Sequence, residues 1–179
     1  MDTREHIFND KLKARFNGDS GIPRLRKFTL VPVRGVVLHP TNTTRMGELV
    51  AQYDELVAAA KKARENAHAK FSNFLVGAAL RSRSGKIFAG CNVENATYGL
   101  TVCAERVAIF KAISEGERHF DAIAVVTDTD ALTPPCGACR QLIWEFCGAV
   151  PVVLANLKGK IEIVPMPELF PWPFDSSNL

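Results

Sequence analysis

The sequence contains no apolar run that approaches the roughly 20 residues needed to span a bilayer. Its start, MDTREHIFND, has no apolar segment of the kind found in secretory signals. Internal repeats and low-complexity segments are absent as well. These absences argue against a membrane protein, a secreted protein and a repeat protein, so we expect a globular protein of the cytoplasm.

A disulfide framework is also not indicated. The chain has five cysteines, an odd number, and two of them form the motif Cys136-x-x-Cys139. In a cytoplasmic protein this motif indicates metal or redox chemistry. The composition is that of a soluble domain, with 47% hydrophobic and 23% charged residues, and 179 residues suffice for one sizeable core.

An excess of positive charge is confined to the start of the chain. Residues 1–46 carry nine Lys and Arg against four Asp and Glu, whereas residues 47–179 carry 13 against 15. The body is therefore not basic, which argues against a nucleic-acid-binding surface. Residues 1–46 also lack a sustained hydrophobic period. We interpret them as a basic arm without an independent fold, either solvated or in contact with another subunit.

From residue 47 onward, hydrophobic spacing predicts helices that alternate with strands. Apolar residues at three- and four-residue spacing predict a helix over 48–66. Strands separated by helices are typical of an α/β layered domain with a mixed sheet. The other expected elements are a hairpin over 74–80 and 86–90, helices over 103–116 and 136–146, and strands over 120–128, 149–156 and 160–166.

Three thiols stand at the starts of two expected helices. Cys103 opens one helix, while Cys136 and Cys139 open the other, one turn apart. Helix N-termini carry free N–H groups and partial positive charge, which favour the thiolate. Three protein ligands with an open fourth position are the pattern of catalytic zinc. The spacing therefore predicts one Zn²⁺ per chain.

An acid, Glu105, lies two residues after Cys103. Alone it would be an ordinary first-turn carboxylate, which the helix dipole favours. Zinc, however, lowers the pKa of a water molecule that it binds towards about 7, and a base must then carry the proton. Together with the three thiols, Glu105 is predicted to be this proton shuttle.

Other interpretations of the cysteines stay open at this point. A C-x-x-C pair also occurs in thioredoxin-like redox proteins, although the preceding Pro pair and the third thiol argue against that function. A structural four-cysteine site would need Cys91 or Cys147 as its fourth ligand, and both are more simply explained as packing residues. A non-catalytic zinc-stabilised module is the alternative from another class, and an acid at position 105 argues against it.

Four segments carry a family resemblance: FSNFLVGAAL (71–80), GCNVENATYGLTVCAERVAIFKA (90–112), PCGACRQLIWEF (135–146) and LFPWPFDSSNL (169–179). They resemble the cytidine deaminase family, most closely its small homotetrameric branch with three zinc-binding cysteines. The likeness covers about residues 48–179. It implies a three-layer α/β/α domain over 47–179 with about five strands. The implied reaction is hydrolytic deamination of cytidine and deoxycytidine in pyrimidine salvage.

The resemblance implies the zinc ligands and the shuttle deduced above, and it adds polar residues around them. Asn92 and Glu94 match residues that bind the ribose hydroxyls, for which an amide and a carboxylate supply donors and acceptors. Arg106 matches an arginine that follows the catalytic glutamate in the family. A guanidinium that donates to a thiolate withdraws negative charge and so restores the pull of the metal on water.

Three further positions are matched to substrate binding. Phe74 corresponds to an aromatic residue that packs near the nucleoside, and Phe174 to one that stacks on the base from a neighbouring subunit. Without the resemblance, each would be taken as a core residue. Ala104 is the third position. The implied partners are therefore a small nucleoside and other copies of the chain in a tetramer with shared active sites, with no nucleic acid and no membrane.

The sequence departs from the family pattern at two places. Phe71 stands where the family usually has Tyr, which makes the substrate range uncertain and leaves N4-modified cytidines as candidates. The arm at 1–46 has no counterpart in the short members, and would either extend the subunit interface or cover the mouth of a pocket. The nearest rival is a blasticidin-S-type deaminase of the same fold, against which the Phe174 segment argues.

Overall fold

A five-stranded mixed sheet lies at the centre of the computed structural model, which describes residue 47 and residues 50–179. The strand order is β2-β1-β3-β4-β5; β3 and β4 run parallel, and the other neighbouring pairs are antiparallel. The predicted α/β class with about five strands is confirmed. The arm at 1–46 lies outside the described residues. The strands are β1 (Gly77–Ser82), β2 (Ile87–Cys91), β3 (Phe120–Thr127), β4 (Pro151–Asn156) and β5 (Ile161–Pro165).

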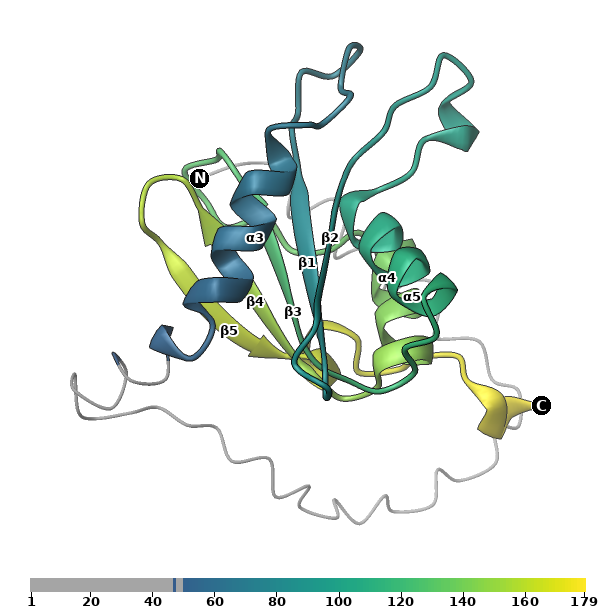
Figure 1. The fold of residues 1–179 in the computed structure, drawn as a ribbon. Coiled ribbons are helices and arrows are strands. Elements are labelled where there is room, and N and C mark those ends of the chain that lie inside the picture. The colour runs from purple at the N-terminus through teal and green to yellow at the C-terminus, as the bar shows by residue number, and fades with distance from the viewer. Residues whose placement is uncertain (1–46, 48–49) are drawn as a thin grey trace, which may run out of the picture. The chain divides into compact units, whose positions relative to one another are not determined.

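Helices cover both faces of this sheet. Helix α3 packs on one face, and α4 and α5 lie side by side on the other (Figure 1). In the described ranges, no helix is long and apolar enough to cross a bilayer. The helical elements are α3 (Asp54–Arg64), η1 (Tyr98–Leu100), α4 (Ala104–Ser114), α5 (Gly137–Cys147), α6 (Met166–Leu169) and η2 (Ser176–Asn178).

Each buried strand contributes alternate residues to two separate cores. On β3, Ile123 and Val125 pack in the core beneath α4 and α5, whereas Ala122, Ala124 and Val126 pack in the core beneath α3. This alternation follows from the two-residue period of a strand. A strand covered on both faces has no polar face, which explains why β3 reads as a continuous apolar run.

Two glycines allow the helices to approach the sheet closely. A Cβ atom on Gly77 of β1 would overlap the carbonyl oxygen of Ala60 and would lie 2.7 Å from the backbone nitrogen of Arg64, both in α3. A Cβ atom on Gly90 of β2 would lie 2.7 Å from the Cβ atom of Val107 in α4. Any larger residue at either position would therefore push a helix away from the sheet.

The predicted elements are present, with two larger differences from their expected bounds. The helix expected over 48–66 is interrupted: residues 50 and 51 are helical, a turn follows in which the Tyr53 N–H bonds the Val50 carbonyl, and α3 then runs over Asp54–Arg64. The strand expected from residue 74 begins at Gly77. Its predicted start is held by a side chain instead, because the Val76 N–H donates to the Asn92 amide oxygen at 2.8 Å.

Candidate metal centre

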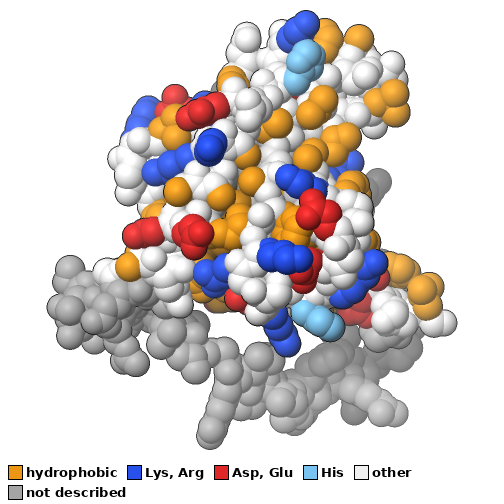
Figure 2. All heavy atoms as spheres, viewed as in Figure 1, with side chains coloured by type: hydrophobic (Ala, Val, Ile, Leu, Met, Phe, Trp, Pro, Cys, Tyr) orange, Lys and Arg blue, Asp and Glu red, His pale blue; other side chains and the backbone are white. Residues whose placement is uncertain are grey.

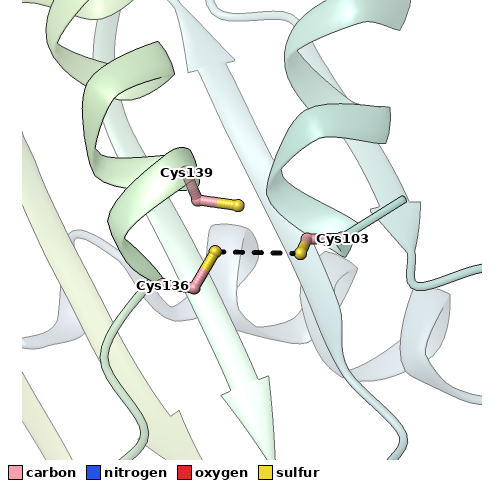
Figure 3. A group of neighbouring side chains, drawn as sticks. All are labelled: Cys103, Cys136 and Cys139. Carbon is pink, nitrogen blue, oxygen red and sulfur yellow. Dashed lines mark hydrogen bonds between the residues drawn. The ribbon is translucent and has the colours of Figure 1, made fainter. Parts of the chain in front are cut away.

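Three cysteines from two helix starts meet at one place. Cys103 precedes α4 and Cys136 precedes α5, each as the extended residue before the first turn, while Cys139 lies within the first turn of α5. The three sulfur atoms point towards one another (Figure 3). Because both helices start at this place, their free N–H groups and dipoles add positive potential to the cluster.

The spacing of the sulfur atoms fits a tetrahedral zinc ion. The Sγ atoms of Cys103 and Cys136 are 3.9 Å apart, and all three lie within 4.8 Å of one another. Four sulfurs around zinc at 2.3 Å would be about 3.8 Å apart. In the described part of the chain, neither Cys91 nor Cys147 joins this cluster. The predicted three-cysteine centre is confirmed, and the donor set is that of zinc.

Without a metal, the cluster favours a single thiolate. The pKa of the Cys103 thiol is lowered to about 5, chiefly by its hydrogen bond with the Cys139 thiol and also by the Arg106 guanidinium. The pKa of Cys139 is raised, because its thiol donates to the Cys103 thiolate and because it is buried. A divalent cation would be needed to hold all three sulfurs as thiolates.

Arg106 faces this negative charge. Its Nη2 atom donates to the Cys103 sulfur at 3.7 Å and to the Thr101 carbonyl at 2.8 Å. The hydrogen bond to Cys103 also raises the pKa of the guanidinium. Within the described residues, the Arg106 Nε atom is buried and has no hydrogen-bond partner. The guanidinium is therefore placed beside the thiolates, and its role in offsetting their charge stays a prediction.

Glu105 is a buried acid in the first turn of α4. The residue is only 4% exposed. Burial raises the pKa of the Glu105 carboxyl, and the charge of Cys103 raises it further. A carboxylate with a raised pKa is a stronger base than an ordinary one, which is a property that suits an acid–base catalyst. The shuttle role of Glu105 remains a prediction.

Asn92 and Glu94 lie beside the strand segment that leads to Cys103. Val93, between them, pairs with Val102 through two backbone hydrogen bonds of 2.9 and 3.0 Å. The Asn92 amide bonds the backbone on its other side, accepting from Val76 N–H and donating to the Phe74 carbonyl, both at 2.8 Å. One amide hydrogen and one lone pair remain for a ligand. Ribose binding by both residues stays a prediction.

The Glu94 carboxylate holds the loop that precedes Phe74. It accepts hydrogen bonds from the N–H groups of Phe71 and Ser72, at 2.8 and 3.2 Å, and from the Ser72 hydroxyl. These bonds lower the pKa of Glu94, with the Ser72 hydroxyl as the largest cause. Sequence reasoning missed this contact, because Ser72 becomes the partner of Glu94 only through the tertiary pairing of the two loops.

The remaining expected substrate residues are spread over three elements. Ala104 is fully buried at the start of α4, and Phe74 is 40% exposed in the loop before β1. Phe174 is 59% exposed in the C-terminal segment, whose backbone is tied to α5 because Gln141 Nε2 donates to the Phe174 carbonyl at 2.6 Å. The stacking roles expected for both rings remain predictions.

The fold and the centre together define a class of protein. The domain has α/β/α layers and three thiols at zinc spacing, and a buried acid that is not a ligand, Glu105, lies two residues after Cys103. These features define a zinc-dependent hydrolase of the deaminase type. The family model "Cytidine and deoxycytidylate deaminase zinc-binding region" matches residues 50–155. The chain belongs to this family.

Relatives agree with this membership over nearly their whole length. A cytidine deaminase of Sporosarcina psychrophila is 53% identical over 70% of this chain and 93% of its own. The crystal structure of a cytidine deaminase from Burkholderia pseudomallei is similar with a TM-score of 0.65 and 50% identity, over 67% of this chain and 97% of its own. A blasticidin-S deaminase of Bacillus cereus is 36% identical over 54% of this chain and 74% of its own.

Proposed function

We propose that the chain catalyses the hydrolytic deamination of cytidine and deoxycytidine to uridine and deoxyuridine, with release of ammonia. The observation that carries this proposal is the cluster of three thiols at zinc spacing with a buried acid, Glu105, on the same helical turn as Cys103. The two cytidine deaminases named above, 53% and 50% identical to this chain over the aligned residues, support the substrate class.

Each residue of the centre has a distinct task in this proposal. Cys103, Cys136 and Cys139 hold Zn²⁺, which supplies Lewis acidity and makes water a nucleophile near neutral pH. Arg106 donates to the Cys103 sulfur and so limits the negative charge that the thiolates place on the metal. Glu105 is not one of the three ligands, so it would remain free to exchange protons with a water molecule that the zinc ion would bind.

Glu105 moves the protons of the reaction. It takes a proton from the attacking water and delivers it to N3 of the pyrimidine, while the water oxygen adds to C4. It then takes the remaining proton from the hydroxyl on C4 and delivers it to the amino group, so that C4=O forms, the C4–N bond breaks and ammonia leaves. The raised pKa of the Glu105 carboxyl makes it a better proton acceptor than an ordinary carboxylate, which suits a group that first takes up a proton.

We propose that Asn92 and Glu94 bind the ribose and that copies of the chain share active sites in a tetramer. Exposed aromatic side chains support assembly: Phe71 is 52% exposed and Tyr98 is 77% exposed, and their rings make an edge-to-face contact at 6.2 Å. Figure 2 shows hydrophobic side chains gathered at the outer end of the loops that project beyond the sheet. Such patches mark association surfaces.

Two alternatives have observations of their own. A blasticidin-S-type activity is supported by 36% identity to a blasticidin-S deaminase, although that match covers only 54% of this chain. The higher identity to cytidine deaminases favours the nucleoside substrate. A non-catalytic zinc module would have no use for Glu105, since burying an acid without a function costs stability.

The test is an absorbance assay of the zinc-loaded protein with cytidine, deoxycytidine, N4-methylcytidine and blasticidin S. We expect turnover of the first two and an at least about 100-fold loss of kcat in Glu105→Gln with zinc content unchanged. Glu115→Gln, at the exposed end of α4, is the matched control and should keep full activity. Full activity in Glu105→Gln would refute the shuttle, and turnover of blasticidin S alone would replace the proposed substrate.

A further inference from the structure

We infer that a polar network, built on two buried side chains at the ends of β3 and β4, positions the loop that carries Cys136 and thereby sets the affinity of the centre for zinc. The network consists of Thr127, Thr129, Thr133 and Asn156. It is separate from the ligands, from Glu105 and from the expected substrate residues. The inference rests on zinc binding by the cysteines and not on which nucleoside is deaminated.

The network begins where two parallel strands end. Thr127 is the last residue of β3 and Asn156 the last residue of β4, and they are register partners. Each is only 1% exposed. Buried polar groups of this kind are costly unless they are hydrogen-bonded. Thr127 and Asn156 therefore need hydrogen-bond partners, and the connection that follows β3 is near enough to supply them.

The partners are two hydroxyls of the β3–α5 connection. Thr127 Oγ1 lies 2.8 Å from Thr129 Oγ1 and donates to Thr133 Oγ1 at 3.1 Å, and the hydroxyls of Thr129 and Thr133 are 3.0 Å apart. Thr129 Oγ1 also donates to the Ala131 carbonyl at 2.6 Å. The three hydroxyls thus lie within 3.1 Å of one another, and their hydrogen bonds hold both ends of the segment 129–133 against the end of the sheet.

Asn156 ties the same loop to β4. Its Nδ2 atom donates to the Thr129 carbonyl at 2.8 Å. Its Oδ1 atom accepts from the N–H groups of Lys158 and Lys160, at 3.0 and 2.9 Å, in the turn towards β5. The amide therefore joins two loops that are far apart in sequence, and its orientation is fixed from both sides.

A stiff segment, Pro134-Pro135, connects Thr133 to the metal ligand Cys136, so the position of Thr133 restricts the position of Cys136. Pro134 and Pro135 alone separate Thr133 from Cys136, and proline fixes its own φ angle. Pro135 is fully buried, and its carbonyl accepts a hydrogen bond from Arg140 Nε at 2.8 Å. Cys136 itself is exposed, unlike the fully buried Cys139. Core packing thus fixes the Cys139 sulfur, whereas the backbone that leads from the network must fix Cys136.

The test compares two buried hydroxyl deletions. Thr127→Val removes the central hydroxyl of the network, and we expect the zinc dissociation constant to rise about tenfold, as for other groups that orient metal ligands. Ser82→Ala is the matched control. Ser82 is fully buried and lies 2.7 Å from the Ser84 hydroxyl, but it pairs with Phe120 at the opposite end of β3. Its zinc affinity should equal that of the wild-type chain.

Zinc affinity is measured by competition with a chromophoric chelator, and thermal unfolding is recorded for every variant. Loading with Co²⁺ gives a second readout, because the sulfur-to-cobalt charge-transfer bands report the geometry of the thiolates; these bands should change in Thr127→Val and stay unchanged in Ser82→Ala. Thr127→Ser keeps the hydroxyl and should restore both readouts.

Equal zinc affinity in Thr127→Val and Ser82→Ala, with the wild-type cobalt spectrum in both, would overturn the inference. If Thr127→Val does not fold, Thr133→Val takes its place with the same expected loss, and unchanged affinity there would overturn the inference equally. Because neither readout needs a nucleoside, an inactive protein would contradict the proposed function and leave this test intact.

Discussion

At the level of single residues, the thiols of this chain differ in the charge that their surroundings favour. The Cys103 thiol has its pKa lowered to about 5, first by its bond with Cys139 and then by Arg106. Burial raises the pKa of the Cys147 thiol to about 12. Since the thiolate is the nucleophile, these two residues should react very differently after zinc is removed.

We predict that iodoacetamide at pH 7 modifies Cys103 of the chelator-treated protein at least about tenfold faster than Cys147. The measurement is mass spectrometry of peptides from timed samples. Cys147 is the internal control, because it should remain unmodified with and without zinc. Zinc loading should protect Cys103. Equal rates at the two cysteines in the folded protein would contradict the prediction.

Glu94 provides a pH-dependent contact. Its pKa is lowered by the Ser72 hydroxyl and by backbone N–H groups, so the folded chain favours the carboxylate. A lowered pKa means that the contact stabilises the fold above the ordinary glutamate pKa of about 4.3 and is lost as the pH falls through the lower, folded value. The loop before Phe74 should therefore loosen only in acid.

Ser72→Ala should raise the pKa of Glu94 towards its ordinary value, because the hydroxyl is the largest cause of the shift. The measurement is an NMR titration of the Glu94 side-chain carboxyl. Ser84→Ala is the matched control, since the Ser84 hydroxyl donates to another carboxylate, Glu117, at 3.0 Å. An unchanged Glu94 midpoint in Ser72→Ala would show that the backbone donors alone cause the shift.

Residues differ in how far the sequence predicts their roles. The cysteine cluster was predictable, because Cys136 and Cys139 are one turn apart and all three thiols stand at helix starts, where local rules apply. Ser72 and Asn156 were not predictable, because their partners, Glu94 and Thr129, are brought near them only by tertiary structure. An isolated polar residue in a sequence does not reveal a partner more than 20 positions away.

At the level of elements, periodicity predicted which segments are helices and strands better than where they begin. The helix expected over 48–66 is broken by a turn before α3 begins at Asp54, and β1 begins at Gly77, later than expected. The delay at β1 has a physical cause, since Asn73 adopts a positive φ of 57° and the Asn92 amide bonds the Phe74 carbonyl and the Val76 N–H. Residues 74–76 are all apolar, so a prediction from hydrophobicity alone starts the strand too early.

The contact between α3 and β1 depends on the missing side chain of Gly77. A Cβ atom at this position would overlap the Ala60 carbonyl oxygen, and the backbone of α3 would have to move to make room for it. We predict that Gly77→Ala lowers the free energy of unfolding by about 1–3 kcal/mol or more. Denaturant unfolding followed by circular dichroism measures this change.

Gly99→Ala is the control for this substitution. A Cβ atom on Gly99 would meet nothing within 4 Å, so its free energy of unfolding should stay within about 0.5 kcal/mol of the wild-type value. A Gly77→Ala variant that is as stable as Gly99→Ala would show that α3 can move off the sheet at little cost.

At the level of the whole molecule, the described residues that build both hydrophobic cores lie between Tyr53 and Phe170. We therefore predict that a chain without residues 1–46 still folds and binds one zinc ion. Thermal unfolding and metal analysis measure this outcome against the full chain. Loss of zinc or of cooperative unfolding in the shortened chain would mean that the arm belongs to the fold. A changed mass in sedimentation, with zinc retained, would assign it to assembly.

The proposed sharing of active sites between subunits can be tested by complementation, which only an oligomer can show. Phe174 is 59% exposed, and its segment is anchored to α5 by Gln141, so the ring is available to a neighbouring copy. If the site combines Glu105 of one subunit with the aromatic ring of another, two defective variants should complement each other. Glu105→Gln lacks the proton shuttle, and Phe174→Ala lacks the ring.

We predict that co-expressed Glu105→Gln and Phe174→Ala chains, purified through two different tags, are more active than either variant alone. Random assembly would make about a quarter of the sites complete, because each needs one intact residue from each of two subunits. The control is the double variant on one chain co-expressed with Glu105→Gln, in which no complete site can form. Activity of the mixed oligomer no higher than that of Phe174→Ala subunits by themselves would mean that each chain completes its own site.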